Sequence, residues 1–173
     1  DPIPSRGLGD VYKRQAVTFS FLSGDDAVRF GGGADNLKLV NPISADLSVM
    51  RPSILPNLLS ASARNQDRGE ADAAMFEVGP VFLGDAPEDQ RTAATGIRHG
   101  GIAPREWHGS ARAIDVFDAR ADAEAALAAL GVKLAGVKVK AEGPDWFHPG
   151  RRGQLIQGRT VLASFGEIHP AVA

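Results

Sequence analysis

A capped amphipathic helix followed closely by an alternating strand constrains the fold of this chain more than any other feature of its sequence. Ser53 suits the N-cap position, and Pro56 falls in the first turn, where its missing N–H costs nothing. Gly69 offers a C′ stop. The apolar residues that mark one face of this helix are Ile54, Leu55, Leu58, Leu59 and Ala63.

The predicted strand spans Ala73 to Phe82, with the sequence AAMFEVGPVF. Alternate residues of a strand share a face, which places Phe76, Val78, Pro80 and Phe82 on one side and Met75, Glu77, Gly79 and Val81 on the other. Because proline cannot donate a ladder hydrogen bond, Pro80 indicates an edge position or a bulge at that end of the strand.

The remaining segments predict shorter strands and one further helix. Asp118 is expected to cap a helix that runs through Leu130 and ends at Gly131. Gly158-Arg159 is predicted to form a two-residue hairpin turn. The expected short strands are Ala16–Ser23, Leu37–Val40, Thr92–His99, Ala113–Phe117 and Val132–Ala141. Strands joined by hairpins and loops beside two main helices indicate an antiparallel α+β class.

Composition excludes several functions. The net charge is −2, so a nucleic-acid role has to rest on a local patch rather than on a global basic field. The chain has no cysteine, which excludes disulfides, thiolate metal sites and a cysteine nucleophile and suits a cytoplasmic protein. No apolar run approaches the roughly 20 residues that span a bilayer, and no signal peptide is visible.

Residues 1–15 differ from the rest of the chain. They contain Pro2, Pro4, Gly7 and Gly9 and show neither a helical nor a strand period. We expect these residues to be a non-native leader and residues 16–173 to form one incomplete domain. The sequence stops directly after a strand-like run at its C-terminal end, so we interpret the chain as a fragment truncated there.

Most potential catalytic or metal-binding motifs are weak. The triplet Gly31–Gly33 lacks the lysine of a phosphate loop, which favours an ordinary flexible loop. The histidines show no metal-ligand spacing. Asp115 and Asp118 have no third partner for acid–base chemistry. A metal-dependent hydrolase that uses His148, Asp115 and His169 therefore remains a minor alternative.

Two clusters stand out. The first is LVNPISADLSVMRPSILPNLL, residues 39–59, where a rigid turn, an arginine expected to be exposed and the capped helix occur together. The second is WFHPGRRGQLI, residues 146–156, where Arg151 and Arg152 beside His148 could bind a phosphate or a carboxylate. From the residues alone, an arginine pair on a solvated turn is the favoured explanation of the second cluster.

Together and in order, these clusters resemble the beta-subunit family of bacterial phenylalanyl-tRNA synthetases. The family pattern N-P-I-S-x-x-x-S-x-M-R-P-S-x-L-P-x-L-L is matched from Asn41 to Leu59, through residues that include Pro42, Arg51, Pro52, Leu55 and Leu58. The pattern F-E-V-G-x-V-F is matched from Phe76 to Phe82 and includes Glu77. The runs D-x-F-D, W-x-H-P-G-R and F-G-E-x-H-P follow at residues 115–118, 146–151 and 165–170.

The resemblance implies a class II aminoacyl-tRNA synthetase-like antiparallel sheet flanked by helices. It implies a part of phenylalanine-tRNA ligase that assembles with the catalytic alpha subunit and supports tRNA, with ATP and Mg used by the assembled enzyme. Active class II domains hold the ATP α-phosphate with an arginine on the strand equivalent to Met75–Phe82, and this strand has none. We therefore expect no catalytic, cofactor or metal residue in this chain.

The candidate subunit-interface or structural residues are Asn41, Pro42, Arg51, Pro52, Leu55, Leu58 and Glu77, and the candidate anion or tRNA contacts are His148, Arg151 and Arg152. If the first group forms the interface, Arg51→Ala and Leu58→Asp should weaken assembly more than they unfold the domain. A synthetase-like paralogue that acts as a binding or regulatory module without an alpha subunit is the main alternative.

Overall fold

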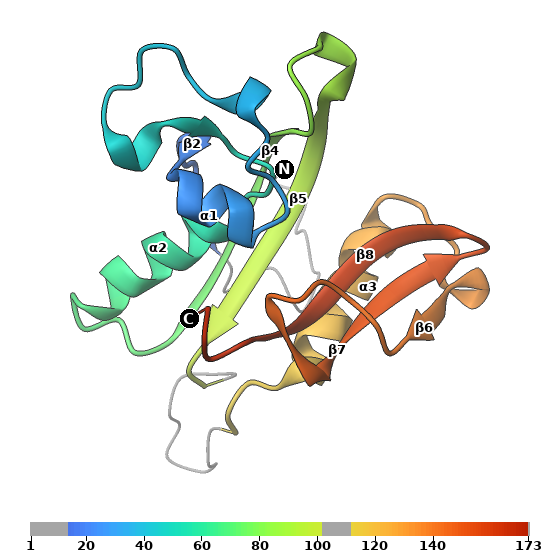
Figure 1. Cartoon of the computed structure of the whole chain (residues 1–173). Helices are drawn as coiled ribbons and strands as arrows, with labels where there is room; N and C mark the ends of the chain where they lie inside the picture. Colours follow the sequence, from blue (N-terminus) through green and yellow to red (C-terminus); the bar gives the residue numbers. More distant parts are fainter. Residues whose placement is uncertain (1–13, 102–111, 173) are drawn as a thin grey trace, which may run out of the picture. The chain divides into compact units, whose positions relative to one another are not determined.

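The computed structural model describes residues 14–101 and 112–172. It divides into two compact units, residues 1–99 and 100–173 (Figure 1). The first unit contains β1 (Arg14–Gln15), β2 (Phe21–Leu22), α1 (Gly24–Arg29), β3 (Val49–Met50), α2 (Leu55–Gln66), β4 (Ala73–Phe82) and β5 (Gln90–His99). The second contains α3 (Val116–Ala129), β6 (Lys138–Lys140), β7 (Phe147–Gln157) and β8 (Thr160–Ile168). The predicted α+β class is confirmed.

The long hairpin of β4 and β5 forms the main sheet of the first unit, with the strand order β1-β4-β5 (Figure 1). β4 and β5 are antiparallel, whereas β1 pairs with β4 in parallel. The predicted bounds of β4 and its two faces are confirmed, because Met75, Glu77 and Val81 are buried along one side. Met75 and Val81 pack with Ile54 and Leu58, so α2 covers this face of the sheet.

α2 begins one residue later than an N-cap at Ser53 would place it. The helix starts at Leu55, and the Ser53 hydroxyl oxygen accepts a hydrogen bond from the Leu55 backbone N–H at 3.2 Å. Ile54 occupies the N-cap position without a side-chain cap, while Pro56 lies in the first turn as expected. Gly69 has a φ of 94°, the left-handed conformation that follows many helix ends.

A smaller core in the same unit contains Leu22, Ala27, Leu37 and Val49. The glycine triplet beside it is tightly packed. Gly31 and Gly33 adopt φ values of 87° and 94°, and a Cβ at Gly32 would lie 2.7 Å from Pro52 Cγ. These glycines are therefore explained by backbone conformation and close packing.

The second unit packs α3 against β7 and β8 around Leu127, Leu155 and Phe165. β6, β7 and β8 form an antiparallel sheet in that order. The predicted hairpin turn is confirmed, because Gln157 pairs with Thr160 and Gly158 has a φ of 62°.

The predicted start of α3 was wrong. Asp115, rather than Asp118, is the N-cap, and its carboxylate accepts the backbone N–H groups of Phe117 at 2.8 Å and Asp118 at 3.2 Å. Asp118 in turn accepts the Asp115 N–H at 2.9 Å, completing a capping box. A hydrogen bond from Arg112 to the Asp118 carboxylate raises the pKa of the Arg112 guanidinium. The expected strand Ala113–Phe117 is therefore only an isolated bridge at Ala113.

Three other predicted strands are much shorter than expected. Residues 16–23 contribute only β2 to a strand, and residues 37–40 form a single bridge between Lys38 and Val49. Val132–Ala141 contains β6, but Leu134–Gly136 forms a 3-10 turn that interrupts the alternation. The expected leader lies mostly outside the described residues, and its last two residues form β1.

Candidate functional site

Arg51 is the most buried charged side chain of the described residues, with an exposed fraction of 1%. Its Nη1 lies 2.8 Å from Oε1 of Glu77, which is 3% exposed. The same Nη1 donates to the Thr18 hydroxyl at 2.9 Å, and this hydroxyl donates to Oε2 of Glu77 at 2.7 Å. Both carboxylate oxygens are thus satisfied, as a buried ion pair requires.

Arg51 also closes the open edge of β4. Its Nε donates to the Pro80 carbonyl at 2.8 Å, and its own carbonyl accepts the Phe82 N–H at 2.9 Å. β1 reaches only Met75 and Phe76, so Arg51 occupies the edge farther along the strand. The edge position predicted for Pro80 is confirmed, because the N–H that proline lacks would point away from β5.

Gly79 completes this arrangement. A Cβ at this position would lie 2.7 Å from Nη2 of Arg51. Residue 79 is therefore a glycine because the guanidinium fills the space that a side chain would need. The two family-like runs around Arg51 and Glu77 form one physical unit in the folded chain.

The expectation that Arg51 is exposed was wrong. Leu58 is 0% exposed and packs with Met75 and Val81 of β4, and Leu55 is also buried. Replacing Arg51 would leave the buried Glu77 carboxylate without its ion-pair partner. An aspartate at position 58 would place a new charge in the core. Arg51→Ala and Leu58→Asp are therefore expected to unfold the first unit, whereas the sequence alone predicted that they would weaken assembly more than they unfold the domain.

The N-terminal part of the same family-like run is exposed. Asn41 and Pro42 lie on the surface, and their neighbours Val40 and Ile43 are 94% and 84% exposed. Pro52 is partly buried against the glycine loop. The candidate interface residues are thus divided between a buried structural group and an exposed loop, residues 40–44, that carries apolar side chains.

In the second unit, His148 stacks on His169 with ring centroids 6.1 Å apart and an interplanar angle of 23°. Each ring follows the same local pattern, because the Nδ1 atoms accept backbone N–H groups from Gly150 and Ala171, both at 3.1 Å. Sequence reasoning missed this pairing. The available signal was that both histidines precede a proline.

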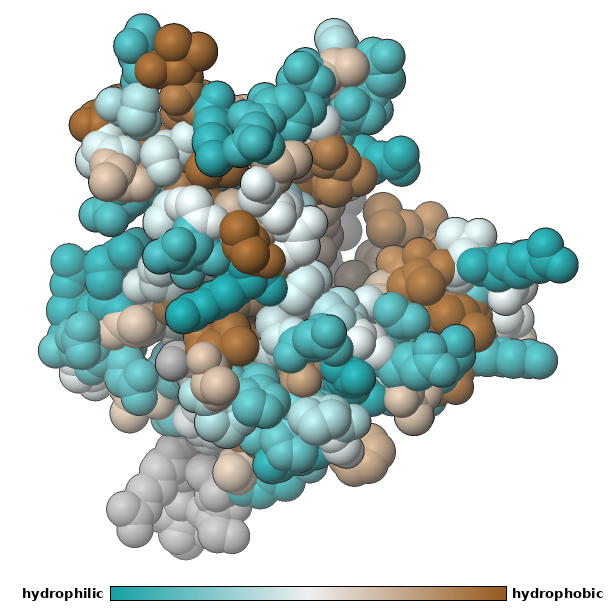
Figure 2. Space-filling model, in the orientation of Figure 1, coloured by the Kyte–Doolittle hydropathy of each residue, from teal (hydrophilic) through white to brown (hydrophobic). Residues whose placement is uncertain are grey.

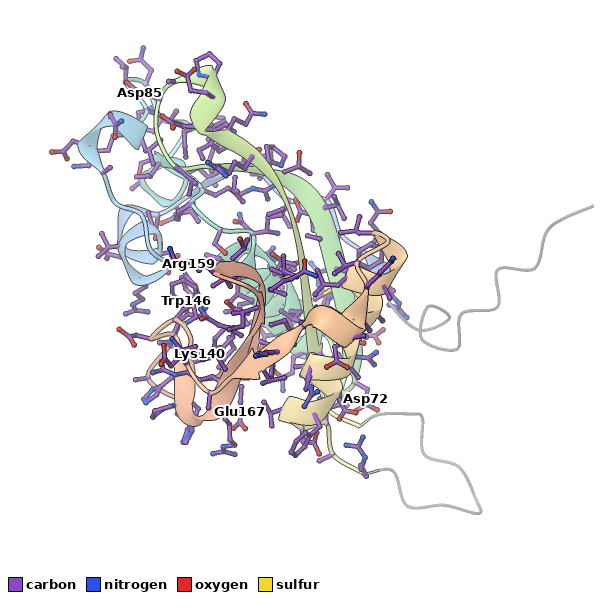
Figure 3. All side chains as sticks on the ribbon, turned by 90° about the vertical axis from the view of Figure 1, so that its right-hand side faces the viewer. Asp72, Asp85, Lys140, Trp146, Arg159 and Glu167 are labelled. Carbon is purple, nitrogen blue, oxygen red and sulfur yellow. The ribbon has the colours of Figure 1, made fainter. Side chains whose placement is uncertain are left out.

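Arg151 and Arg152 lie in β7 rather than on a turn, and both are engaged with the chain itself. Arg151 forms an exposed ion pair with Glu167 at 2.8 Å, and Figure 3 labels Glu167. Arg152 donates to the Pro144 carbonyl at 2.9 Å and lies 3.3 Å from Asp145. Binding of an anion by His148, Arg151 and Arg152 stays a prediction, and it would have to compete with these carboxylates.

The hydrolase interpretation gains no support from the geometry. The Asp115 carboxylate is occupied by the cap of α3, while the two histidines stack on each other. Within residues 14–101 and 112–172, no cluster of three or more metal-ligating side chains could hold an ion. No helix of these same ranges is long and apolar enough to cross a membrane.

Comparison with solved structures defines the class of fold. The chain is similar to the structure of Desulfitobacterium hafniense PylSc, a pyrrolysyl tRNA synthetase, with a TM-score of 0.56 and 18% sequence identity. The similarity covers 87% of this chain and 50% of that one. The fold is therefore one that occurs in a tRNA synthetase.

The family follows from sequence. The sequence model of one protein family, the phenylalanyl tRNA synthetase beta chain CLM domain, matches residues 10–173. The chain belongs to this family. It is 56% identical over 157 residues to the phenylalanine–tRNA ligase beta subunit of Rhodospirillum rubrum, covering 91% of this chain and 20% of that subunit. The corresponding subunit of Paramagnetospirillum magneticum is 52% identical over 170 residues, covering 98% and 21%. The chain thus spans about a fifth of the length of these relatives.

Proposed function

We propose that this chain is the class II synthetase-like, non-catalytic part of a phenylalanine-tRNA ligase beta subunit. In this role it is a scaffold that joins the catalytic alpha subunit for the ATP-dependent charging of tRNA with phenylalanine in the cytoplasm. The observation that carries the proposal is the state of Arg51. β4 contains no arginine, and the arginine that reaches this strand is buried against Glu77 rather than free for a phosphate.

The loop after β4 also disfavours ATP. Asp85, Glu88 and Asp89 follow the strand, and the Asp85 carboxylate accepts a hydrogen bond from Asn36 at 3.1 Å. Carboxylates at this position repel a triphosphate. ATP and Mg would therefore be bound by the assembled enzyme through the alpha subunit.

Equilibrium dialysis of the chain against ATP with Mg tests this part of the proposal. We expect no saturable binding by the isolated chain and clear binding by the assembled ligase. Saturable binding by the isolated chain would contradict the non-catalytic role.

The proposed contact with the alpha subunit is the exposed loop of residues 40–44. Ile43 is 84% exposed and lies within the family-like run, although the first unit does not need it for its own core. Ile43→Asp is expected to weaken the complex by about 2 kcal/mol or more, as for an interface hot spot. Co-purification of a tagged alpha subunit with a beta subunit that carries this chain measures the effect.

Leu83→Asp is the matched control, because Leu83 is 57% exposed in the same unit but lies outside this loop. The control should leave the complex intact, and neither variant should lower the melting temperature. Full retention of the complex by Ile43→Asp would exclude the loop as the contact. Failure of the parent subunit to bind any alpha subunit would favour the independent paralogue.

A further inference from the structure

The charges of the second unit are unevenly matched. Six carboxylates of residues 112–172 form ion pairs with cations of the same unit, namely Asp115, Asp118, Glu124, Glu142, Asp145 and Glu167. Three cations of this range, Lys133, Lys138 and Arg159, take part in none of these pairs and are exposed. None of these ion pairs therefore neutralises the three positive charges.

These three cations belong to one end of the β6-β7-β8 sheet. Lys138 opens β6 and pairs with Ile156, next to the end of β7. Arg159 lies in the turn between β7 and β8. Lys133 directly precedes the 3-10 turn Leu134–Gly136, where a Cβ at Gly136 would lie 3.1 Å from Gln157 Nε2. We call Lys133, Lys138 and Arg159 the basic end of the sheet.

The residues around the basic end leave its positive electrostatic potential largely uncompensated. Residues 130–140 and 153–164, which build this end, contain no aspartate or glutamate. Lys140, farther along β6, pairs with Glu142 at 2.7 Å and is largely neutralised. Gln157 and Thr160 add exposed, uncharged hydrogen-bonding groups beside the turn. Figure 3 labels Lys140 and Arg159 on this sheet.

We propose that the basic end binds backbone phosphates of tRNA. Phosphate contacts use lysine and arginine together with the side chains of glutamine and threonine, which is the set of groups found here. The inference rests on the proposed function as a ligase subunit and names a surface that could support tRNA.

An acidic protein partner is the other chemistry to consider. Protein hot spots are enriched in aromatic residues, and residues 130–140 and 153–164 contain none. The right-hand part of Figure 2, over β6, β7 and β8, shows a group of apolar side chains with long hydrophilic side chains extending beyond it. The charges thus favour a repeating polyanion over a protein surface.

The test compares the affinity of the 173-residue chain for a phenylalanine tRNA across a series of salt concentrations. The variant is Lys133→Ala/Lys138→Ala/Arg159→Ala. The matched control is Arg29→Ala/Arg68→Ala/Arg91→Ala, which removes three exposed cations of the first unit. Removing one phosphate-binding cation should reduce the slope of log affinity against log salt by about 1, so the slope should fall by about 3 in the variant and stay unchanged in the control.

Equal slopes for the parent chain, the variant and the control would overturn the proposal. So would a variant that keeps its tRNA slope but no longer co-purifies with the alpha subunit, since the basic end would then be a protein contact. Circular dichroism of each variant guards against misfolding, and Lys133→Arg/Lys138→Arg/Arg159→Lys should restore the slope. If the parent chain binds tRNA in this way but never joins an alpha subunit, the proposed function fails while the basic end stands.

Discussion

Arg51 in the first unit and Arg151 in the second each lie 2.8 Å from a glutamate, yet their surroundings are opposite. The side chains of Arg51 and Glu77 are 1% and 4% exposed, whereas those of Arg151 and Glu167 are 51% and 43% exposed. Water screens the second pair and leaves it little net energy, while the first pair has exchanged all of its hydration for protein partners. The same contact distance therefore carries very different consequences for the fold.

The largest loss of stability is expected when the buried ion pair of Arg51 and Glu77 is broken. Glu77→Ala should lower the free energy of unfolding of the first unit by about 3–5 kcal/mol, because the Arg51 charge would stay buried without its partner. Urea unfolding followed by circular dichroism measures this loss, since both tryptophans lie beyond residue 99. A loss below about 1 kcal/mol would place the buried pair on a level with exposed ones.

The double variant Arg51→Met/Glu77→Leu sharpens the same comparison. It removes both charges together, so its loss of stability should be much smaller than that of either single charge deletion. Thr18 and the Pro80 carbonyl lose a hydrogen bond in this variant, which leaves some cost. A double variant that is less stable than Glu77→Ala would show that the hydrogen bonds, rather than charge balance, dominate.

Gly79→Ala should cost about 1–3 kcal/mol, as expected for overpacking a filled site. The new methyl group would meet Nη2 of Arg51 at 2.7 Å. Gly150→Ala is the control in the second unit, where the nearest atoms to a Cβ lie 3.6 Å away in the ring of His148. Urea unfolding of the two variants should separate them clearly, and equal losses would mean that Arg51 moves aside freely.

Loss of the half-exposed capping residue Asp115 should lower the free energy of unfolding by an intermediate amount. Asp115→Ala removes the cap of α3 and is expected to cost about 0.5–2 kcal/mol. Tryptophan fluorescence during urea unfolding reports on this unit, because both tryptophans lie beyond residue 99. Asp115→Asn keeps a capping group and should recover most of the loss.

The smallest effect is expected from the exposed pair. Arg151→Ala should change the free energy of unfolding by about 0–1 kcal/mol, and less at high salt. The same fluorescence measurement tests it. A loss near that of Glu77→Ala would erase the contrast between the two units.

Local patterns were sufficient to predict the regular elements that depend on neighbouring residues. β4, α2 and the β7–β8 turn all follow from alternation, helical spacing or a glycine at a tight turn. The burial of Arg51 could not be read in this way, because its partner Glu77 is 26 positions away and on another element. The stacking of His148 on His169 likewise depends on how β7 and β8 align. The start of α3 was misplaced because two candidate aspartates stand at capping distance from each other.

The packing of Gly79 beneath the Arg51 guanidinium also limits how this part of the molecule can evolve. Loss of the arginine alone leaves an orphaned glutamate, and loss of the glutamate alone leaves an orphaned arginine, so neither single step is neutral. A larger residue at position 79 becomes acceptable only after the guanidinium has gone. Lineages in which position 51 is not arginine are therefore expected to have changed position 77 as well, and only those lineages are free to replace the glycine.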